Sequence, residues 1–336
     1  MKILIVAPAW VGDMVMAQSL FKSLRNDYSD AVLDVVAPSW SLPIIDRMPE
    51  IRRGIALSAG HGQLHIAARI RTGRFLAGNA YDRAIVLPRT WKSALIPFFA
   101  KIPVRTGFRG EFRYGLINDM RKLDKTVLTM TVLRYLALGR ERRAKIVPEI
   151  RFYPELQADP ENRDRLVKTL GLRMDRPVAV FCPGAEYGPA KQWPLDHYRR
   201  LAEMLIADGY QVWTLGSSKE AGAAERIDPG STGFVNLCGR TRLVDTVDLM
   251  SLAVCAVTND SGLMHVAAAA GIPVQAIYGS SSPAYTPPLT TRADIHRLGL
   301  ECSPCFKRQC PPGHLDCLKK ISPESVHGSI RARADG

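Results

Sequence analysis

Short apolar runs rich in β-branched residues alternate with longer amphipathic stretches along this chain of 336 residues. In the first half, the apolar runs predict strands at 2–7, 33–37, 82–87 and 104–106. The stretches between and after them predict helices at 14–25, 42–48, 61–76, 92–99 and 126–138. Strands that alternate with helices of this length are typical of a doubly wound parallel sheet.

The same pattern restarts after a polar, proline-punctuated stretch at 140–160, which is the predicted linker. Strands are predicted at 177–182, 211–215, 235–237, 253–257 and 274–278, with helices at 195–208, 219–227 and 263–270. We therefore predict an α/β protein with two Rossmann-like domains facing across a cleft, residues 1–165 and 166–320, and a C-terminal helix or tail at 321–336. Neither half contains a GxGxxG motif, which argues against a dinucleotide oxidoreductase.

The net charge of +13 is unevenly distributed between the two halves. Residues 1–170 contain 28 Lys and Arg against 16 Asp and Glu, whereas residues 171–336 contain 17 against 16. The first half is expected to face a polyanion or an anionic membrane surface, although a basic surface without such a partner has the same composition. No apolar run reaches the roughly 18 residues of a membrane span, and the start reads as a strand rather than a signal peptide. These features predict a cytoplasmic protein.

A polar loop that contains glycine joins a strand to a helix near residue 260. The strand at 253–257 runs into Thr258–Gly262, and an alanine-rich helix follows to about Ala270. The free backbone N–H groups and the dipole at such a helix start favour an anion, most often phosphate. His265 lies one turn into this helix and can face the same opening. The pattern also fits an ordinary helix cap by Asp260 or Ser261, with His265 as a core histidine.

Two other strand ends carry residues that suit a reaction at a sugar. Asp13 follows Gly12 at the end of the first strand, where a carboxylate fits either a general base or a simple N-cap. Lys191 lies in a loop rich in glycine and proline, 183–194, where a mobile ammonium suits a phosphate oxygen. The loop at 215–220 is a weaker candidate for contacts with ribose hydroxyls.

Four of the seven cysteines fall within 16 positions, as C-x2-C-x4-C-x6-C. In a chain predicted to be cytoplasmic, this clustering favours a metal over disulfides. Zinc would fit tetrahedral ligation by Cys302, Cys305, Cys310 and Cys317, or by three of them with His314, as a structural site. Free thiols or a redox pair remain the alternative, because the spacing is not a standard zinc pattern.

These motifs resemble one known family. The stretches WVGDMVMAQSL, PGAEYGPAKQWP and TNDSGLMHVAAA resemble those of the ADP-heptose:lipopolysaccharide heptosyltransferases. Two others, PFFAKIPVRTGFRGEFRYGLIND and YGSSSPAYTPPL, look like type II members. The similarity runs from residue 1 to about 289. It implies two Rossmann domains of the GT-B type and inverting transfer of L-glycero-D-manno-heptose from ADP-heptose to the first heptose of the Kdo2-lipid A core.

The resemblance also assigns roles to residues. Asp13 matches the proposed base and Lys191 the lysine at the ADP phosphates. The set around the sugar nucleotide is Gly12, Gly184, Lys191, Glu220 (for ribose), Asp260, Ser261, Gly262 and His265. The basic first domain becomes the acceptor domain, with candidate contacts at His61, Arg89, Lys92, Arg109 and Arg113, each of which also fits a solvated surface charge.

The implied partners are ADP-L-glycero-D-manno-heptose, the Hep-Kdo2-lipid A acceptor and the anionic cytosolic face of the inner membrane, with no nucleic acid. No DxD-like metal motif is apparent, so no cofactor is expected to be required for catalysis. Two alternatives stay open. One is a sister heptosyltransferase, type I or III, acting on Kdo or on a later core sugar. The other is a non-catalytic basic α/β binding protein, although no basic-aromatic RNA signature supports it.

Overall fold

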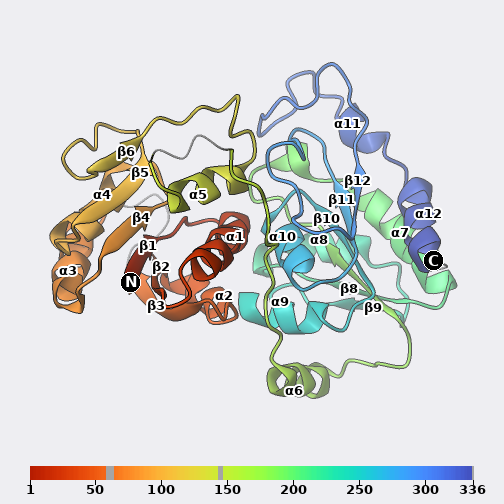
Figure 1. Ribbon diagram of the computed structural model, residues 1–336. Coiled ribbons are helices and arrows are strands. Elements are labelled where there is room, and N and C mark those ends of the chain that lie inside the picture. Colours follow the sequence, from red (N-terminus) through yellow and green to blue (C-terminus); the bar gives the residue numbers. More distant parts are fainter. Residues whose placement is uncertain (58–63, 143–146, 335–336) are drawn as a thin grey trace. The chain divides into compact units, whose positions relative to one another are not determined.

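The computed structural model describes residues 1–57, 64–142 and 147–334 (Figure 1). The chain forms two compact units, Met1–Pro154 and Glu155–Gly336. Each unit contains a six-stranded parallel sheet, and the two sheets have the same strand order, β3-β2-β1-β4-β5-β6 and β9-β8-β7-β10-β11-β12. This is the strand order of a doubly wound Rossmann sheet, so the predicted pair of parallel α/β domains is confirmed.

The strands of the first sheet are β1 (Lys2–Val6), β2 (Val32–Pro38), β3 (Ile51–Leu57), β4 (Arg83–Val86), β5 (Val104–Phe108) and β6 (Asp119–Arg121). Those of the second are β7 (Val178–Cys182), β8 (Gln211–Thr214), β9 (Phe234–Asn236), β10 (Cys255–Asn259), β11 (Val274–Ile277) and β12 (Ala293–His296). The sequence patterns did not predict β3, β6 or β12. All three lie at or near the edges of their sheets.

The helices of the first unit are α1 (Val11–Asp27), α2 (Leu42–Ile45), α3 (Ile66–Leu76), α4 (Trp91–Phe99) and α5 (Thr131–Gly139). Those of the second are α6 (Pro160–Leu170), α7 (Leu195–Ala207), α8 (Ala221–Ile227), α9 (Leu243–Met250), α10 (Gly262–Ala269), α11 (Asp316–Lys319) and α12 (Pro323–Ala334). The helix predicted from residue 126 begins only at Thr131. The reason is a turn before it, in which the Asp124 side chain accepts hydrogen bonds from the backbone N–H and the hydroxyl of Thr126.

The boundary between the units lies earlier than the predicted 165/166 division. Helix α6 belongs to the second unit because its start is tied to α9. The Asp159 side chain caps α6 through the N–H groups of Glu161 and Asn162. The Asn162 amide in turn donates to Asp248 (2.5 Å) and to Asp245 (3.0 Å) of α9.

The segment predicted as a C-terminal tail is part of the second unit's core. Val326 and Ile330 of α12 are buried in the cluster that also contains Phe181 of β7 and Trp193. The Trp193 indole N–H donates to the Ile321 carbonyl (3.0 Å). Residues 321–334 are therefore not a separate region. Among the described residues, no helix has both the length and the apolar character needed to cross a membrane.

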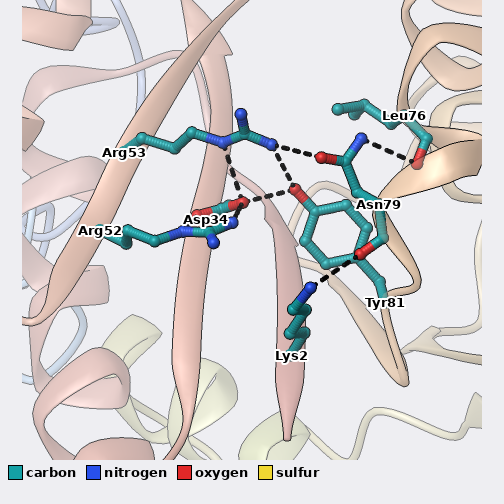
Figure 2. A network of polar contacts seen from close by, with 7 residues as sticks. All are labelled: Lys2, Asp34, Arg52, Arg53, Leu76, Asn79 and Tyr81. Carbon is teal, nitrogen blue, oxygen red and sulfur yellow. Dashed lines mark hydrogen bonds and ion pairs between the residues drawn. The ribbon is translucent and has the colours of Figure 1, made fainter.

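A buried carboxylate holds the edge strand β3 against β2 (Figure 2). The strand register shifts between Leu33 and Asp34. The Asp34 carboxylate, fully buried, accepts from Arg52 Nε (2.9 Å), Arg53 Nε (3.1 Å) and the Tyr81 hydroxyl (2.5 Å). Burial raises the pKa of Asp34, but the hydrogen bonds from Arg52, Tyr81 and Arg53 outweigh it, so the pKa lies below its usual value of 3.8.

We expect Asp34→Asn to lower the free energy of unfolding by about 2 kcal/mol, because both arginines lose a buried anionic partner while remaining partly solvated. Because the folded pKa is lowered, the wild-type advantage is present at neutral pH. It starts to fall near about pH 5 and is lost as the pH drops through the folded pKa. Urea unfolding of wild type and variant at several pH values measures this difference. Asp82→Asn is the control, since its exposed carboxylate accepts only from the Lys2 backbone N–H (2.7 Å) among the contacts described. An equal loss in both variants would contradict the assigned role.

Candidate active site

The strand order of the second sheet reverses between β7 and β10, which lie side by side. In open parallel sheets, ligands bind outside the carboxyl ends of the strands at such a reversal, because the loops that follow the two strands diverge there. The loop at 183–194 follows β7, and Asp260–Gly262 follows β10. The two donor-site motifs predicted from the sequence therefore meet at one edge of one sheet.

Lys191 and Asp260 are the central contact of this edge. The Lys191 ammonium lies 2.6 Å from the Asp260 carboxylate, and the side chains are only 18% and 5% exposed. Lys191 is therefore not a solvated surface lysine. Because its charge is shared with a carboxylate, the ammonium is held in place before any ligand arrives.

Asn259 fixes both ends of the loop at 183–194, here called the lysine loop. Its carboxamide oxygen accepts from the Trp193 backbone N–H (3.0 Å) and the Tyr198 hydroxyl (3.2 Å). Its amide nitrogen donates to the carbonyls of Pro183 (2.9 Å) and Gly184 (3.2 Å). Asn259 is fully buried, so each of these groups would be costly to leave unpaired.

Helix α10 begins at this edge without a side-chain cap. Ser261 occupies the N-cap position, and its hydroxyl makes no capping hydrogen bond in the described part of the chain. Asp260 pairs with Lys191 instead. The interpretation of Asp260 or Ser261 as an ordinary capping side chain is therefore wrong. The uncapped first turn, at Gly262, suits an anion.

Several buried polar atoms around this helix start have no hydrogen-bond partner within the described residues, among them His265 Nδ1, Ser280 Oγ and Ser281 Oγ. The sequence analysis did not single out the two serines, which follow β11 at the same edge of the sheet. Burial lowers the pKa of His265 to about 4; nearby Asp260 raises it and Lys191 lowers it further. The imidazole is therefore neutral near pH 7 and can donate or accept one hydrogen bond.

Glu220 ends the predicted loop at 215–220 and lies beside Gly184 of the loop at 183–194. One of its carboxylate oxygens accepts from the Ser217 backbone N–H (2.7 Å) and hydroxyl (2.6 Å), which forms a capping box before α8. The other oxygen faces Gly184, where a Cβ would lie 3.6 Å from it. The structure thus places Glu220 beside the lysine loop, and its role toward ribose remains a prediction.

In the first unit, Asp13 lies in the first turn of α1, directly after β1 at the strand reversal of that sheet. Trp10 holds the N-cap position, so Asp13 is not the cap. Gly12 is buried, and Asp13 is partly exposed. This position suits a base that must reach a substrate hydroxyl, and the base role remains a prediction.

The structure removes Arg113 from the candidate acceptor contacts. Its side chain is fully buried, and the guanidinium donates to the carbonyls of Phe108 (3.1 Å) and Pro88 (2.7 Å). Burial lowers its pKa to about 10, which still leaves it charged at pH 7. Arg89 and Arg109 are exposed and Lys92 is partly exposed, as an acceptor contact requires; His61 lies outside the described residues.

A basic pocket in the first unit was missed by the sequence analysis. It lies beyond the carboxyl ends of β5 and β6, and its lining includes Phe108, Arg121, Lys122 and Arg140. The Arg121 guanidinium already donates to the carbonyls of Ala137 (2.6 Å) and Arg140 (2.8 Å), so Lys122, Arg140 and Arg142 are the cations more available to a ligand. They come from two separate segments of the sequence, which only the fold brings together.

The clustered cysteines remain without a demonstrated role. Cys317 is buried, whereas Cys302 is exposed. Burial raises the pKa of the Cys317 thiol, and the nearby thiols of Cys302, Cys310 and Cys305 raise it further. As the side chains of the described residues lie, no three His, Cys, Asp or Glu form a set that could hold a metal. The structural zinc therefore stays a prediction to which this geometry adds no support.

Known proteins of one family are similar to this chain. Residues 69–315 match the family described as glycosyltransferase family 9 (heptosyltransferase). The chain is 46% identical over 335 residues to lipopolysaccharide heptosyltransferase 2 of Salmonella typhimurium, covering 97% of this chain and 96% of that protein. It is 45% identical to the Escherichia coli protein of the same name, covering 99% and 98%. The solved structure of the E. coli ADP-heptose heptosyltransferase II aligns over the whole of both chains, with a TM-score of 0.87 and 40% identity.

We expect Asn259→Ala to weaken binding of ADP by at least about tenfold, because the lysine loop loses its anchors at Pro183 and Trp193. Isothermal titration with ADP measures the effect. Asn118→Ala is the control: Asn118, in the first unit, accepts from the Arg105 backbone N–H (2.8 Å) and donates to the Pro103 carbonyl (2.7 Å). If both variants bind ADP equally well, Asn259 does not position the loop.

We expect the imidazole of His265 to stay neutral from about pH 8 down to pH 5. Since its folded pKa is lowered to about 4, the unfolded chain takes up this proton first, and stability falls as the pH drops from about 6.5 toward 4. Histidine-selective NMR, with His265→Gln to assign the signal, tests this expectation. A titration midpoint near 6.5 for that signal would contradict the burial argument.

Proposed function

Because this chain belongs to glycosyltransferase family 9, the heptosyltransferases, we propose that it transfers L-glycero-D-manno-heptose from ADP-heptose to the first heptose of the lipopolysaccharide inner core, with inversion. The observation that carries the donor assignment is the Lys191–Asp260 pair beside the uncapped start of α10, at the strand reversal of the second sheet. Similarity to type II relatives over nearly the full length supports the choice of acceptor.

In the proposed reaction, the acceptor hydroxyl attacks the anomeric carbon in line with the departing diphosphate. The new glycosidic C–O bond forms as the bond from the anomeric carbon to the phosphate oxygen breaks. The hydroxyl proton passes to the Asp13 carboxylate, and ADP leaves with the bonding electron pair. One base and a stabilised leaving group are sufficient for this displacement, and no covalent enzyme intermediate is needed.

The growing charge on the leaving diphosphate would be met by protein groups. The Lys191 ammonium and the backbone N–H groups at Ser261 and Gly262 are directed to the same strand end. Donors that are already in place stabilise charge that develops in the transition state without reorganising. We propose that Glu220 binds the ribose, and that neutral His265 and Gly184 complete the donor site.

The basic first unit would bind the acceptor, whose phosphates and Kdo carboxylates are anionic. Arg89, Lys92 and Arg109 remain candidates, joined by the pocket that contains Lys122 and Arg140. Since this acceptor is a lipid, we propose that the enzyme works at the anionic cytosolic face of the inner membrane, held by electrostatic attraction.

The decisive experiment is mass spectrometry of Hep-Kdo2-lipid A after treatment with ADP-heptose and purified protein. We expect the mass of one added heptose and release of ADP. Asp13→Asn should lower kcat by about 10²–10⁴-fold and leave ADP affinity within about twofold, since only proton transfer is lost.

Asp27→Asn, at the exposed end of the same helix, is the matched control and should behave as wild type. Full activity of Asp13→Asn would overturn the base assignment. Transfer to Kdo2-lipid A lacking heptose, with none to the heptosylated acceptor, would identify a sister enzyme instead.

A further inference from the structure

The segment from Ser303 to Arg308, here called the strap, lies against the lysine loop. The Ala190 N–H donates to the Arg308 carbonyl (3.1 Å). Gly188 permits this approach, because a Cβ there would lie only 2.6 Å from the same carbonyl oxygen. Arg308 is thus attached at its main chain to residues that flank Lys191.

Two further contacts fix the rest of the strap. The Phe306 N–H donates to the Ser280 carbonyl after β11 (2.7 Å). The buried Ser303 hydroxyl donates to the Gly279 carbonyl (2.6 Å). Because the strap is tied to two strand-end loops, the position of the Arg308 Cα is well defined, although its side chain is exposed.

Two cations share the ring of Tyr187. Lys191 Nζ lies 5.1 Å from the ring centroid, and Arg308 Cζ lies 5.4 Å from it. The Tyr187 hydroxyl donates to the Phe306 carbonyl of the strap (2.7 Å), so the ring itself is held. The guanidinium and the ammonium are therefore both held within cation–π distance of one fixed ring.

Lys191 and Arg308 differ in whether an acidic side chain pairs with their charge. Lys191 is paired with Asp260, so that pair contributes no net charge. Lys219, which also contacts the lysine loop, is paired with Glu186. Arg308 has no carboxylate within ion-pair distance among the described residues. A diphosphate placed at this edge would meet in Arg308 a positive charge that no acidic side chain offsets.

We propose that Arg308 binds the diphosphate of the sugar nucleotide and supplies a second positive charge as it leaves. This inference rests on the proposed function, because it takes the donor to bind at the lysine loop. The planar guanidinium fits two phosphate oxygens at once, which a lysine at this position would not reproduce in full.

The test is isothermal titration of the full-length protein with ADP and with adenosine. Arg308→Gln should weaken ADP binding by about tenfold and leave adenosine binding within about twofold. Arg308→Lys should recover part of the loss. The deficit of Arg308→Gln should shrink as salt is raised, since screening removes the advantage of the wild-type charge. Lys307→Gln, the exposed neighbour, is the matched control and should bind ADP as wild type does.

Two results would overturn the inference. The first is wild-type ADP affinity in Arg308→Gln while Lys191→Gln is impaired, which leaves the proposed function standing. The second is an equal loss of ADP and adenosine binding in both Arg308 variants, which would assign the residue to structure only. Failure of the wild-type protein to bind ADP would instead overturn the proposed function itself.

Discussion

The adjacency of β7 and β10 is the constraint on which the proposed donor site depends. Their carboxyl ends are neighbours, while the loops that follow them lead to opposite sides of the sheet. A ligand at this edge can therefore be reached by side chains from both loops. Asn259 is the last residue of β10. Its side chain fixes the position of the loop after β7, because it forms hydrogen bonds to both ends of that loop.

In the proposed function, electrostatic balance would let this edge bind a highly charged ligand and still release it. The Lys191–Asp260 pair keeps the ammonium in place at little net charge. Neutral His265 adds hydrogen bonding without adding charge. The remaining attraction comes from the uncapped helix start and, in our proposal, from Arg308. Such an arrangement favours charge that develops during the reaction over charge already present in the substrate.

The central strands could be predicted from sequence because both of their faces are buried. β7 and β10 are buried at every position; β7 reads as a continuous apolar run, and β10 does so up to Val257. The edge strands could not. β3 carries Arg52 and Arg53 in its first half, and its register with β2 shifts once, between Leu33 and Asp34. That pairing depends on a contact between distant residues, which local pattern does not contain.

The positions of the candidate site residues in the fold were predictable to the same extent. A residue in a loop that follows a strand, such as Lys191 or Asp260, can be assigned to the ligand-binding edge of the sheet from strand order alone. Whether a cation faces solvent or satisfies buried carbonyls is a tertiary property. Arg113 was therefore wrongly taken as an accessible acceptor contact, and Arg308, the residue of our proposal, was not among the candidates. The unit boundary was placed too late for a similar reason, since the contacts of Asn162 with α9 are not local.

The packing of Leu318 beneath Gly279 has a consequence for how the protein is made. A Cβ on Gly279 would lie 2.5 Å from the Leu318 side chain, so the end of β11 is shaped around a residue synthesised after every strand of its sheet. During translation, the second sheet can pair before residues 317–330 emerge from the ribosome, but its core stays open to water beside Trp193. A nascent or clipped chain lacking this segment would expose that apolar surface to chaperones and proteases, so the second unit completes its core only after residues 317–330 have been synthesised.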